Sequence, residues 1–180
     1  SRGRLMLNLV HPADDSYTVL TTHLDNEDDT LELGGLLAAA LTPGLKIWLN
    51  GNLGSGKTTL TRGLLRELGH TGKVKSPTYT LIEPYVVSRL DLYHFDFYRL
   101  NSPEEYLDAG LDEYFNGPGV CIVEWPEQAA PYLATPDLVV LIEPEGEGRR
   151  ATLRGLTEAG QTCISQLANC QKKQSPPPGK

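Results

Sequence analysis

The sequence of 180 residues lacks the features that mark membrane, secreted and zinc-binding proteins. No apolar run approaches the roughly 18 residues that a membrane-spanning helix requires, and no secretory signal is recognisable. The three cysteines, Cys121, Cys163 and Cys170, are odd in number and show no C-x-x-C spacing, so neither a zinc site nor a disulfide framework is indicated. These absences predict a protein of the reducing cytoplasm that does not contact a membrane.

The chain also lacks an excess of basic residues. It has 16 Lys and Arg against 23 Asp and Glu, which gives a formal net charge of −7. Because a polynucleotide backbone is bound by positive surfaces, this balance argues against strong binding of a nucleic acid by this chain alone. Any polynucleotide would be reached through a partner protein.

The rest of the composition is that of an ordinary globular domain, with 39% hydrophobic and 22% charged residues. A chain of this length buries about two thirds of its unfolded surface, so one domain is sufficient. We expect an N-terminal extension over residues 1–14, where periodicity is weak, and a single domain over 15–170. Residues 171–180 contain Ser-Pro-Pro-Pro-Gly and are expected to form a disordered tail.

What the sequence does contain is a complete phosphate-loop motif. Residues 51–58 read G-N-L-G-S-G-K-T, which satisfies G-x-x-x-x-G-K-[ST]. Its glycines let successive backbone N–H groups turn inward around a phosphate chain, and the following helix adds its positive N-terminal end. Lys57 would place a charge on the terminal phosphates, and the Thr58 hydroxyl would ligate the Mg²⁺ of a nucleoside triphosphate. The predicted nucleotide-binding residues of this segment are Asn52, Leu53, Gly54, Ser55, Gly56, Lys57, Thr58 and Thr59.

The surroundings of the motif are those that a phosphate loop requires. Residues 45–49 form a short, apolar, β-prone run that follows a Thr-Pro-Gly turn signal. Residues 57–68 carry leucines at helical spacing, and Gly69 ends the run as a C-cap would. Strand, loop and helix therefore occur in the required order.

The other elements follow from periodicity and turn signals, and they alternate between strands and helices. The expected strands are 17–24, 80–87, 90–98, 120–123, 138–142 and 151–156, and the expected helices are 30–41 (N-cap at Asp28, Asp29 or Thr30), 102–115 (capped by Ser102 and Glu105), a short helix or turn at 126–133, and 158–170. Only Ser88 and Arg89 separate two of the strands, which predicts an antiparallel hairpin. The order predicts an α/β, three-layer P-loop NTPase-like domain with a central mixed, mostly parallel sheet.

Two carboxylates occur where such a site needs them. Glu124 ends the apolar strand 120–123, and Asp96 lies inside an aromatic stretch. A phosphate loop uses a carboxylate at the end of an adjacent buried strand to hold the Mg²⁺ shell and organise the attacking water. Two other readings stay open, since Glu124 could cap the next turn and Asp96 could face solvent. The predicted catalytic residues are Lys57, Asp96 and Glu124, and the predicted metal ligands are Thr58, Asp96 and Glu124.

A polar loop containing Ser76, Thr78 and Tyr79 follows Lys57 by about twenty residues, where other phosphate-loop proteins keep a segment that senses the terminal phosphate. Ser76 and Thr78 are therefore added to the predicted nucleotide-binding residues, although a plain Pro-containing turn would also explain the pattern. His94 lies on a strand, where a histidine is more often structural than catalytic.

Four segments together resemble the bacterial TsaE family, the small ATPase of tRNA threonylcarbamoyladenosine biosynthesis. They are G-N-L-G-S-G-K-T-T at 51–59, S-P-T-Y-T-L at 76–81, H-F-D-F-Y-R-L at 94–100 and V-E-W-P-E at 123–127. They occur in the family's order and spacing over about residues 15–145, and the set is far more specific than the phosphate loop alone.

The resemblance implies a Mg²⁺-dependent ATPase, slow on its own, that works with a catalytic threonylcarbamoyl transferase subunit and its inactive paralogue. It implies that hydrolysis resets this complex between turnovers and that tRNA is met only through the complex. The family pattern assigns Lys57 and Thr58 to phosphate and metal, Ser76 and Thr78 to a switch-like loop, Asp96 to the Mg²⁺ shell, Glu124 to catalysis or metal, and Trp125 to nucleotide or partner.

Other phosphate-loop proteins remain as alternatives of different strength. A GTPase is disfavoured, because the sequence has neither an N-K-x-D guanine-reading motif nor a D-x-x-G switch. A small-molecule kinase would bring an arginine-rich lid over the phosphates, and Arg149 and Arg150, in a late hairpin, do not make one. A nucleotide-gated interaction module with negligible turnover is the third reading, and a TsaE-like role partly contains it.

Overall fold

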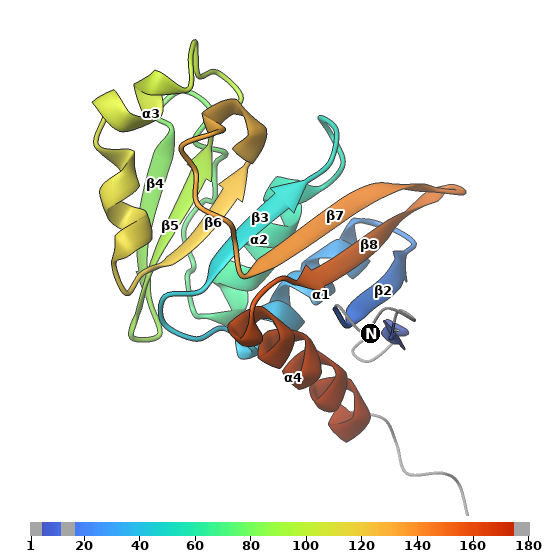
Figure 1. Ribbon diagram of the computed structural model, residues 1–180. Helices are drawn as coiled ribbons and strands as arrows, with labels where there is room; N and C mark the ends of the chain where they lie inside the picture. The colour runs from blue at the N-terminus through green and yellow to red at the C-terminus, as the bar shows by residue number, and fades with distance from the viewer. Residues whose placement is uncertain (1–4, 12–16, 175–180) are drawn as a thin grey trace, which may run out of the picture.

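The β-prone segments form an eight-stranded mixed sheet in the computed structural model, which describes residues 5–11 and 17–174. Within these residues the strand order is β1–β2–β8–β7–β3–β6–β5–β4 (Figure 1). The strands are β1 (Asn8–Val10), β2 (Val19–Leu24), β3 (Lys46–Asn50), β4 (Ile82–Val87), β5 (Leu90–Asp96), β6 (Val120–Glu124), β7 (Leu138–Glu145) and β8 (Gly148–Gly155). The helices are α1 (Glu27–Ala39), α2 (Lys57–Glu67), α3 (Glu104–Asp108) and α4 (Glu158–Gln174), with short 3₁₀ helices η1 (Leu111–Asn116) and η2 (Pro126–Ala129).

The parallel part of the sheet is its centre. β3 pairs in parallel with β6 and β7, and β5 pairs in parallel with β6. The pairs β1–β2, β2–β8, β7–β8 and β4–β5 are antiparallel. The mixed α/β sheet is confirmed, but the expected parallel majority holds only for these four central strands. The reason is that tight hairpins such as Ser88-Arg89, with φ of 46° and 68°, can join only antiparallel strands.

The two faces of the sheet carry separate cores, because successive side chains of a strand point to opposite faces. Ile47 and Leu49 of β3 pack into the core that α1, α2 and α4 share, whereas Trp48 packs against the second core. That second core is formed largely by aromatic side chains from β5, α3 and η1, including Phe95 and Tyr106. Figure 1 shows α1 and α2 behind the centre of the sheet and α3 near its β4–β5 end. Among the described residues, the second layer of helices therefore lies over the half of the sheet that contains β3, β6, β5 and β4.

Close packing of α1 on α2 fixes the helix that follows the phosphate loop. A Cβ atom added at Gly34 would lie 2.2 Å from the carbonyl oxygen of Leu60, and one added at Gly63 would lie 2.2 Å from that of Leu31. The two helix backbones thus meet where no side chain can fit between them. This contact sets the position of α2, and with it the end of the loop.

Helix ends are where the structure departs most from the sequence-based expectations. α1 begins at Glu27, earlier than expected, because Asn26 and not Asp28, Asp29 or Thr30 is its N-cap. The Asn26 Oδ1 atom accepts a hydrogen bond of 3.0 Å from the Asp29 N–H. The helix expected over 102–115 is interrupted, since Gly110, with φ of 71°, separates α3 from η1. Glu105 does reach back to a backbone N–H, but that of Asn101, at 2.9 Å, rather than Ser102.

The domain also extends at both ends of the expected 15–170 range. Part of the expected N-terminal extension forms β1, which pairs with β2, and Leu5 is buried in the main core. α4 continues to Gln174, past the expected end at Cys170. Residues 175–180, where a disordered tail was expected, lie outside the described residues. None of the described helices has the length and apolar character needed to cross a bilayer.

Candidate nucleotide-binding site

The phosphate loop connects the carboxyl end of β3 to the first turn of α2, as the sequence predicts. Gly56 is the N-cap of α2 and has φ of 108°, a left-handed conformation that L side chains rarely adopt. At Gly51, a Cβ would lie 2.5 Å from the Ser55 Oγ and 2.7 Å from the Ile142 carbonyl oxygen. The loop is therefore closed on itself and against β7, and glycine is required at both of its ends.

Lys57 lies at the base of the site, with 5% of its surface exposed. Its Nζ donates a hydrogen bond to the Gly51 carbonyl oxygen and lies 3.9 Å from the centroid of the Trp125 ring. Burial lowers the pKa of Lys57 from its ordinary value, and the carboxylates of Glu124 and Asp96 oppose that shift. An ammonium group has three N–H donors, so one carbonyl acceptor leaves donors for other acceptors such as phosphate oxygens.

The two predicted acids meet at the same edge of the sheet. Asp96 ends β5 and Glu124 ends β6, and the two residues are directly paired in the parallel register. Glu124 is also paired with Leu49, just before the loop. Both acids are buried, with 4% and 3% exposure. The carboxyl ends of parallel strands therefore bring both side chains beside the phosphate loop, and neither faces open solvent.

The carboxylate of Asp96 is fully engaged by the protein. Its Oδ2 accepts hydrogen bonds from the Ser76 Oγ at 2.6 Å and from the Thr78 Oγ1 at 3.2 Å, and its Oδ1 accepts one from the Tyr98 N–H at 2.9 Å. The Ser76 Oγ and the Thr78 Oγ1 lie 3.1 Å apart, within hydrogen-bond distance. Asp96 thus anchors the polar loop that the sequence associates with the terminal phosphate.

Glu124 is held differently, through one of its two oxygens. Its Oε2 lies 2.6 Å from the His94 Nε2 and accepts a long hydrogen bond of 3.4 Å from the Thr58 Oγ1. Within the part of the chain that the structure describes, its Oε1 has no hydrogen-bond partner. This leaves one carboxylate oxygen of Glu124 available beside the residues that would contact phosphate and metal.

These groups surround one pocket of about 620 Å³. The residues lining it are Leu53, Gly54, Gly56, Lys57, Thr58, Thr59, Ser76, Thr78, Asp96, Tyr98, Arg99, Glu124 and Trp125. Every residue of the predicted site lines it except Asn52 and Ser55. Their placement together is an observation, whereas their roles stay predictions.

Tyr98 and Arg99 were not expected in the site, although both belong to the H-F-D-F-Y-R-L segment. The Tyr98 ring lies 5.0 Å from that of Trp125, and the Arg99 guanidinium lies 4.5 Å from the centroid of the Tyr79 ring. Their position right after the buried Asp96 was the available signal.

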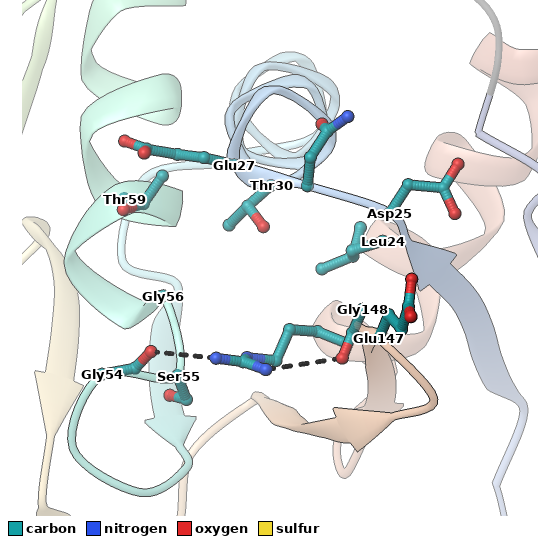
Figure 2. A pocket seen from close by; sticks show the side chains of 12 residues that line it. Leu24, Asp25, Glu27, Thr30, Gly54, Ser55, Gly56, Thr59, Glu147 and Gly148 are labelled. Atoms are coloured by element: carbon teal, nitrogen blue, oxygen red, sulfur yellow. Dashed lines mark hydrogen bonds between the residues drawn. The ribbon is translucent and has the colours of Figure 1, made fainter.

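A second pocket of about 260 Å³ lies on the other side of the loop (Figure 2). It is bounded by the end of β2, the start of α1, the β7–β8 hairpin and the loop residues Gly54, Ser55 and Gly56. Arg149 donates hydrogen bonds of 3.4 Å from Nη2 to the Gly54 carbonyl oxygen and from Nη1 to that of Gly148. On sequence grounds, the place of Arg149 in a late hairpin argues against a role in a lid over the phosphates. Arg149 follows Gly54 by 95 positions, and the strand order makes the two residues neighbours.

A phosphate loop between a parallel strand and a helix, facing a carboxylate on the adjacent strand, defines a P-loop protein of the α/β class. The family model described as "Threonylcarbamoyl adenosine biosynthesis protein TsaE" matches residues 24–167, and the chain belongs to this family.

Comparison with individual proteins agrees with this assignment. The chain is 41% identical over 155 residues to the tRNA threonylcarbamoyladenosine biosynthesis protein TsaE of Haemophilus influenzae, covering 83% of this chain and 98% of that protein. It is 43% identical over 125 residues to the protein of the same name from Bacillus subtilis, covering 69% and 78%. The crystal structure of Bacillus subtilus YdiB is similar with a TM-score of 0.74 at 33% identity, covering 86% of this chain and 97% of that one. The family and the fold class predicted from the sequence are therefore confirmed.

Proposed function

We propose that the chain binds ATP with Mg²⁺ in the larger pocket and hydrolyses it in the cytoplasm, as an accessory protein of tRNA threonylcarbamoyladenosine biosynthesis. Membership of a family named for that pathway supports the pathway. The observation that carries the ATPase proposal is that Lys57, Thr58 and Glu124 line one pocket of about 620 Å³. A phosphate-facing cation, a metal-ligating hydroxyl and an available carboxylate oxygen are the parts that such hydrolysis needs.

The donor set fits a Mg²⁺ ion that arrives with a nucleotide. Among the described residues, no group of three or more His, Cys, Asp and Glu side chains is arranged to hold a metal by itself. Mg²⁺ commonly uses one or two carboxylates together with phosphate oxygens and waters. The Thr58 hydroxyl, 3.4 Å from the Glu124 carboxylate, would supply the protein side of that shell. When bound, the ion would neutralise charge that develops on the phosphates.

Lys57, Glu124 and Asp96 then have separate roles in the proposed hydrolysis. Lys57 donates to the terminal phosphates from a buried position, where its charge is weakly screened. The Oε1 of Glu124 orients the attacking water and accepts its proton. Asp96 accepts hydrogen bonds from Ser76 and Thr78 and so holds their loop against the pocket that would contain the terminal phosphate.

The nucleoside extends toward the smaller pocket. This pocket shares Gly54, Gly56 and Thr59 with the larger one, so a phosphate chain in the loop leads into it. Leu24 offers an apolar wall, and the flat guanidinium of Arg149 can stack on a base. Arg149→Ala should weaken ATP binding but leave binding of inorganic tripolyphosphate closer to that of the unaltered chain, which a titration of both ligands measures.

The partners proposed are the threonylcarbamoyl transferase subunit and its inactive paralogue, whose complex the hydrolysis would reset or regulate. With a net charge of −7, this chain would reach tRNA only through them.

The decisive experiment is ATP hydrolysis by the purified chain, alone and with both partners plus tRNA. It includes the variants Lys57→Ala and Glu124→Ala. Stimulation by the partners that both substitutions remove supports the proposal. Absence of hydrolysis, with phosphate transferred instead to an added small metabolite, would identify a kinase.

A further inference from the structure

A buried histidine, His94, contacts Glu124, one of the two acids of the site. His94 lies on β5, two residues before Asp96 and therefore on the same face of the sheet, and it has no solvent exposure. Its Nε2 lies 2.6 Å from the Oε2 of Glu124, which is 3% exposed. The histidine does not line either pocket beside the loop. Within the described residues, it can therefore act on a ligand in these two pockets only through Glu124.

The surroundings of the second ring nitrogen of His94 indicate which nitrogen of a neutral ring carries the proton. Among the described residues, the buried Nδ1 has no hydrogen-bond partner. A buried N–H without an acceptor is costly, so the proton of a neutral ring belongs on Nε2, where the Glu124 carboxylate accepts it. The hydrogen bond to Glu124 is then the one polar contact that the ring makes within this part of the chain.

We propose that His94 is a positioning residue: it fixes the Oε2 of Glu124 and so leaves Oε1 directed to the water and metal side of the pocket. The other contact of Oε2, from the Thr58 hydroxyl, is longer at 3.4 Å and comes from a residue that a metal would also engage. His94 is thus the contact that holds the carboxylate when Thr58 turns to the metal. This inference rests on the proposed hydrolysis.

The test compares His94→Leu, which fills space but cannot donate, with His94→Gln, whose amide N–H can donate in place of Nε2. Loss of such an orienting partner costs about 10- to 100-fold in activity. We expect His94→Leu to lower the hydrolysis rate by that factor with little change in ATP affinity, and His94→Gln to recover most of the rate. Equal losses for the two variants, or a parallel loss of ATP affinity, would overturn the proposal.

A double substitution separates positioning from general damage to the fold. In the Glu124→Gln background, His94→Leu should lower the residual rate no further, because the residue through which it acts is already altered. A further loss of the same size would overturn the proposal. His11→Gln, at an exposed histidine that contacts Thr18 and lines neither pocket, is the matched control and should leave the rate unchanged.

A nitrogen-15 NMR spectrum of the unaltered chain tests the contact without hydrolysis or folding of a variant. His94 should show a protonated Nε2 and an unprotonated Nδ1, and Glu124→Ala should shift these signals while leaving those of His70 in place. A proton on Nδ1 of a neutral His94 ring would overturn the proposal. If the unaltered chain shows no hydrolysis but the spectrum is as expected, the proposed ATPase function fails and the His94–Glu124 contact stands.

Discussion

The phosphate loop and the wall that faces it are built in different ways. The loop is eight consecutive residues, 51–58, whose function lies in backbone geometry, and a local motif specifies it completely. The facing wall, which we call the acidic wall, consists of Asp96 and Glu124 with the side chains that hold them, Ser76, Thr78 and His94. Its contacts join residues 18 to 30 positions apart, and the register of β5 with β6 places Asp96 and His94 beside Glu124. Local sequence therefore specifies the proposed phosphate-binding loop, whereas the arrangement proposed for hydrolysis depends on how the strands pair.

The acidic wall is itself divided. Asp96 accepts hydrogen bonds from the protein through both oxygens: Oδ2 binds the hydroxyls of the loop at 76–78, and Oδ1 binds the Tyr98 N–H. Glu124 is held through one oxygen only. Two acids at equivalent ends of neighbouring strands are thus held differently, and we expect Asp96 to anchor the loop and Glu124 to take part in the proposed hydrolysis.

The largest effect is expected from Lys57→Ala, which removes the buried cation of the loop. ATP binding or turnover should be lost, with a fall in rate of roughly 10²-fold or more, because no other side chain of the loop carries a positive charge. Calorimetric titration with ATP and a phosphate-release assay measure both quantities. Lys73→Ala removes an exposed lysine as the control, and unchanged affinity and rate in Lys57→Ala would refute the role of the loop.

Glu124→Gln should distinguish most clearly between the phosphate loop, which is expected to set ATP affinity, and the acidic wall, which is expected to set the hydrolysis rate. The rate should fall by roughly 10²-fold, as expected for loss of a general base, while ATP affinity changes much less. Glu113→Gln, at an exposed acid on η1, is the control. Equal losses of rate and affinity would show that Glu124 supports the fold of the site rather than its chemistry.

Asp96→Asn should have a smaller effect on rate, about tenfold, because it weakens the anchor of the 76–78 loop without removing the base. Its diagnostic sign is faster hydrogen exchange of the backbone amides of that loop, measured by mass spectrometry. Asp91→Asn, at an exposed position on the same strand, should leave the exchange unchanged. If Asp96→Asn matched Glu124→Gln in rate with no change in exchange, the two acids would share one task.

The smallest effects are expected from the hydroxyls. Ser76→Ala should cost more than Thr78→Val, since the Ser76 contact with Asp96 is shorter, 2.6 Å against 3.2 Å. A hydrogen bond to a charged group contributes about 1.5–3 kcal/mol, and only part of that should reach the rate. In the Asp96→Asn background both effects should shrink, and rates of the four single and double variants check this.

Much of the fold was predictable from local patterns. The strand, loop and helix around Lys57, the hairpin at Ser88-Arg89 and the strand ending at Glu124 are all confirmed, because turn signals and apolar periodicity act over a few residues. The early cap at Asn26 and the break at Gly110 were missed, since several capping residues compete at one end and a helical pattern hides a single glycine at the other.

The site was predictable only in part for the same reason. The motifs supplied Lys57, Thr58, Asp96 and Glu124, which the structure brings together. They did not supply the approach of Arg149 to the loop or the contact of His94 with Glu124. Both depend on which strands become neighbours, and no local signal in one sequence fixes that order.

The most direct test of the account is a crystal structure of the chain with Mg²⁺ and a non-hydrolysable ATP analogue. The account predicts the phosphates inside the 51–58 loop, the metal on the Thr58 hydroxyl, and Oε1 of Glu124 facing the metal shell or the water behind the terminal phosphate. Phosphates bound elsewhere, or a Glu124 carboxylate turned away from them, would contradict it.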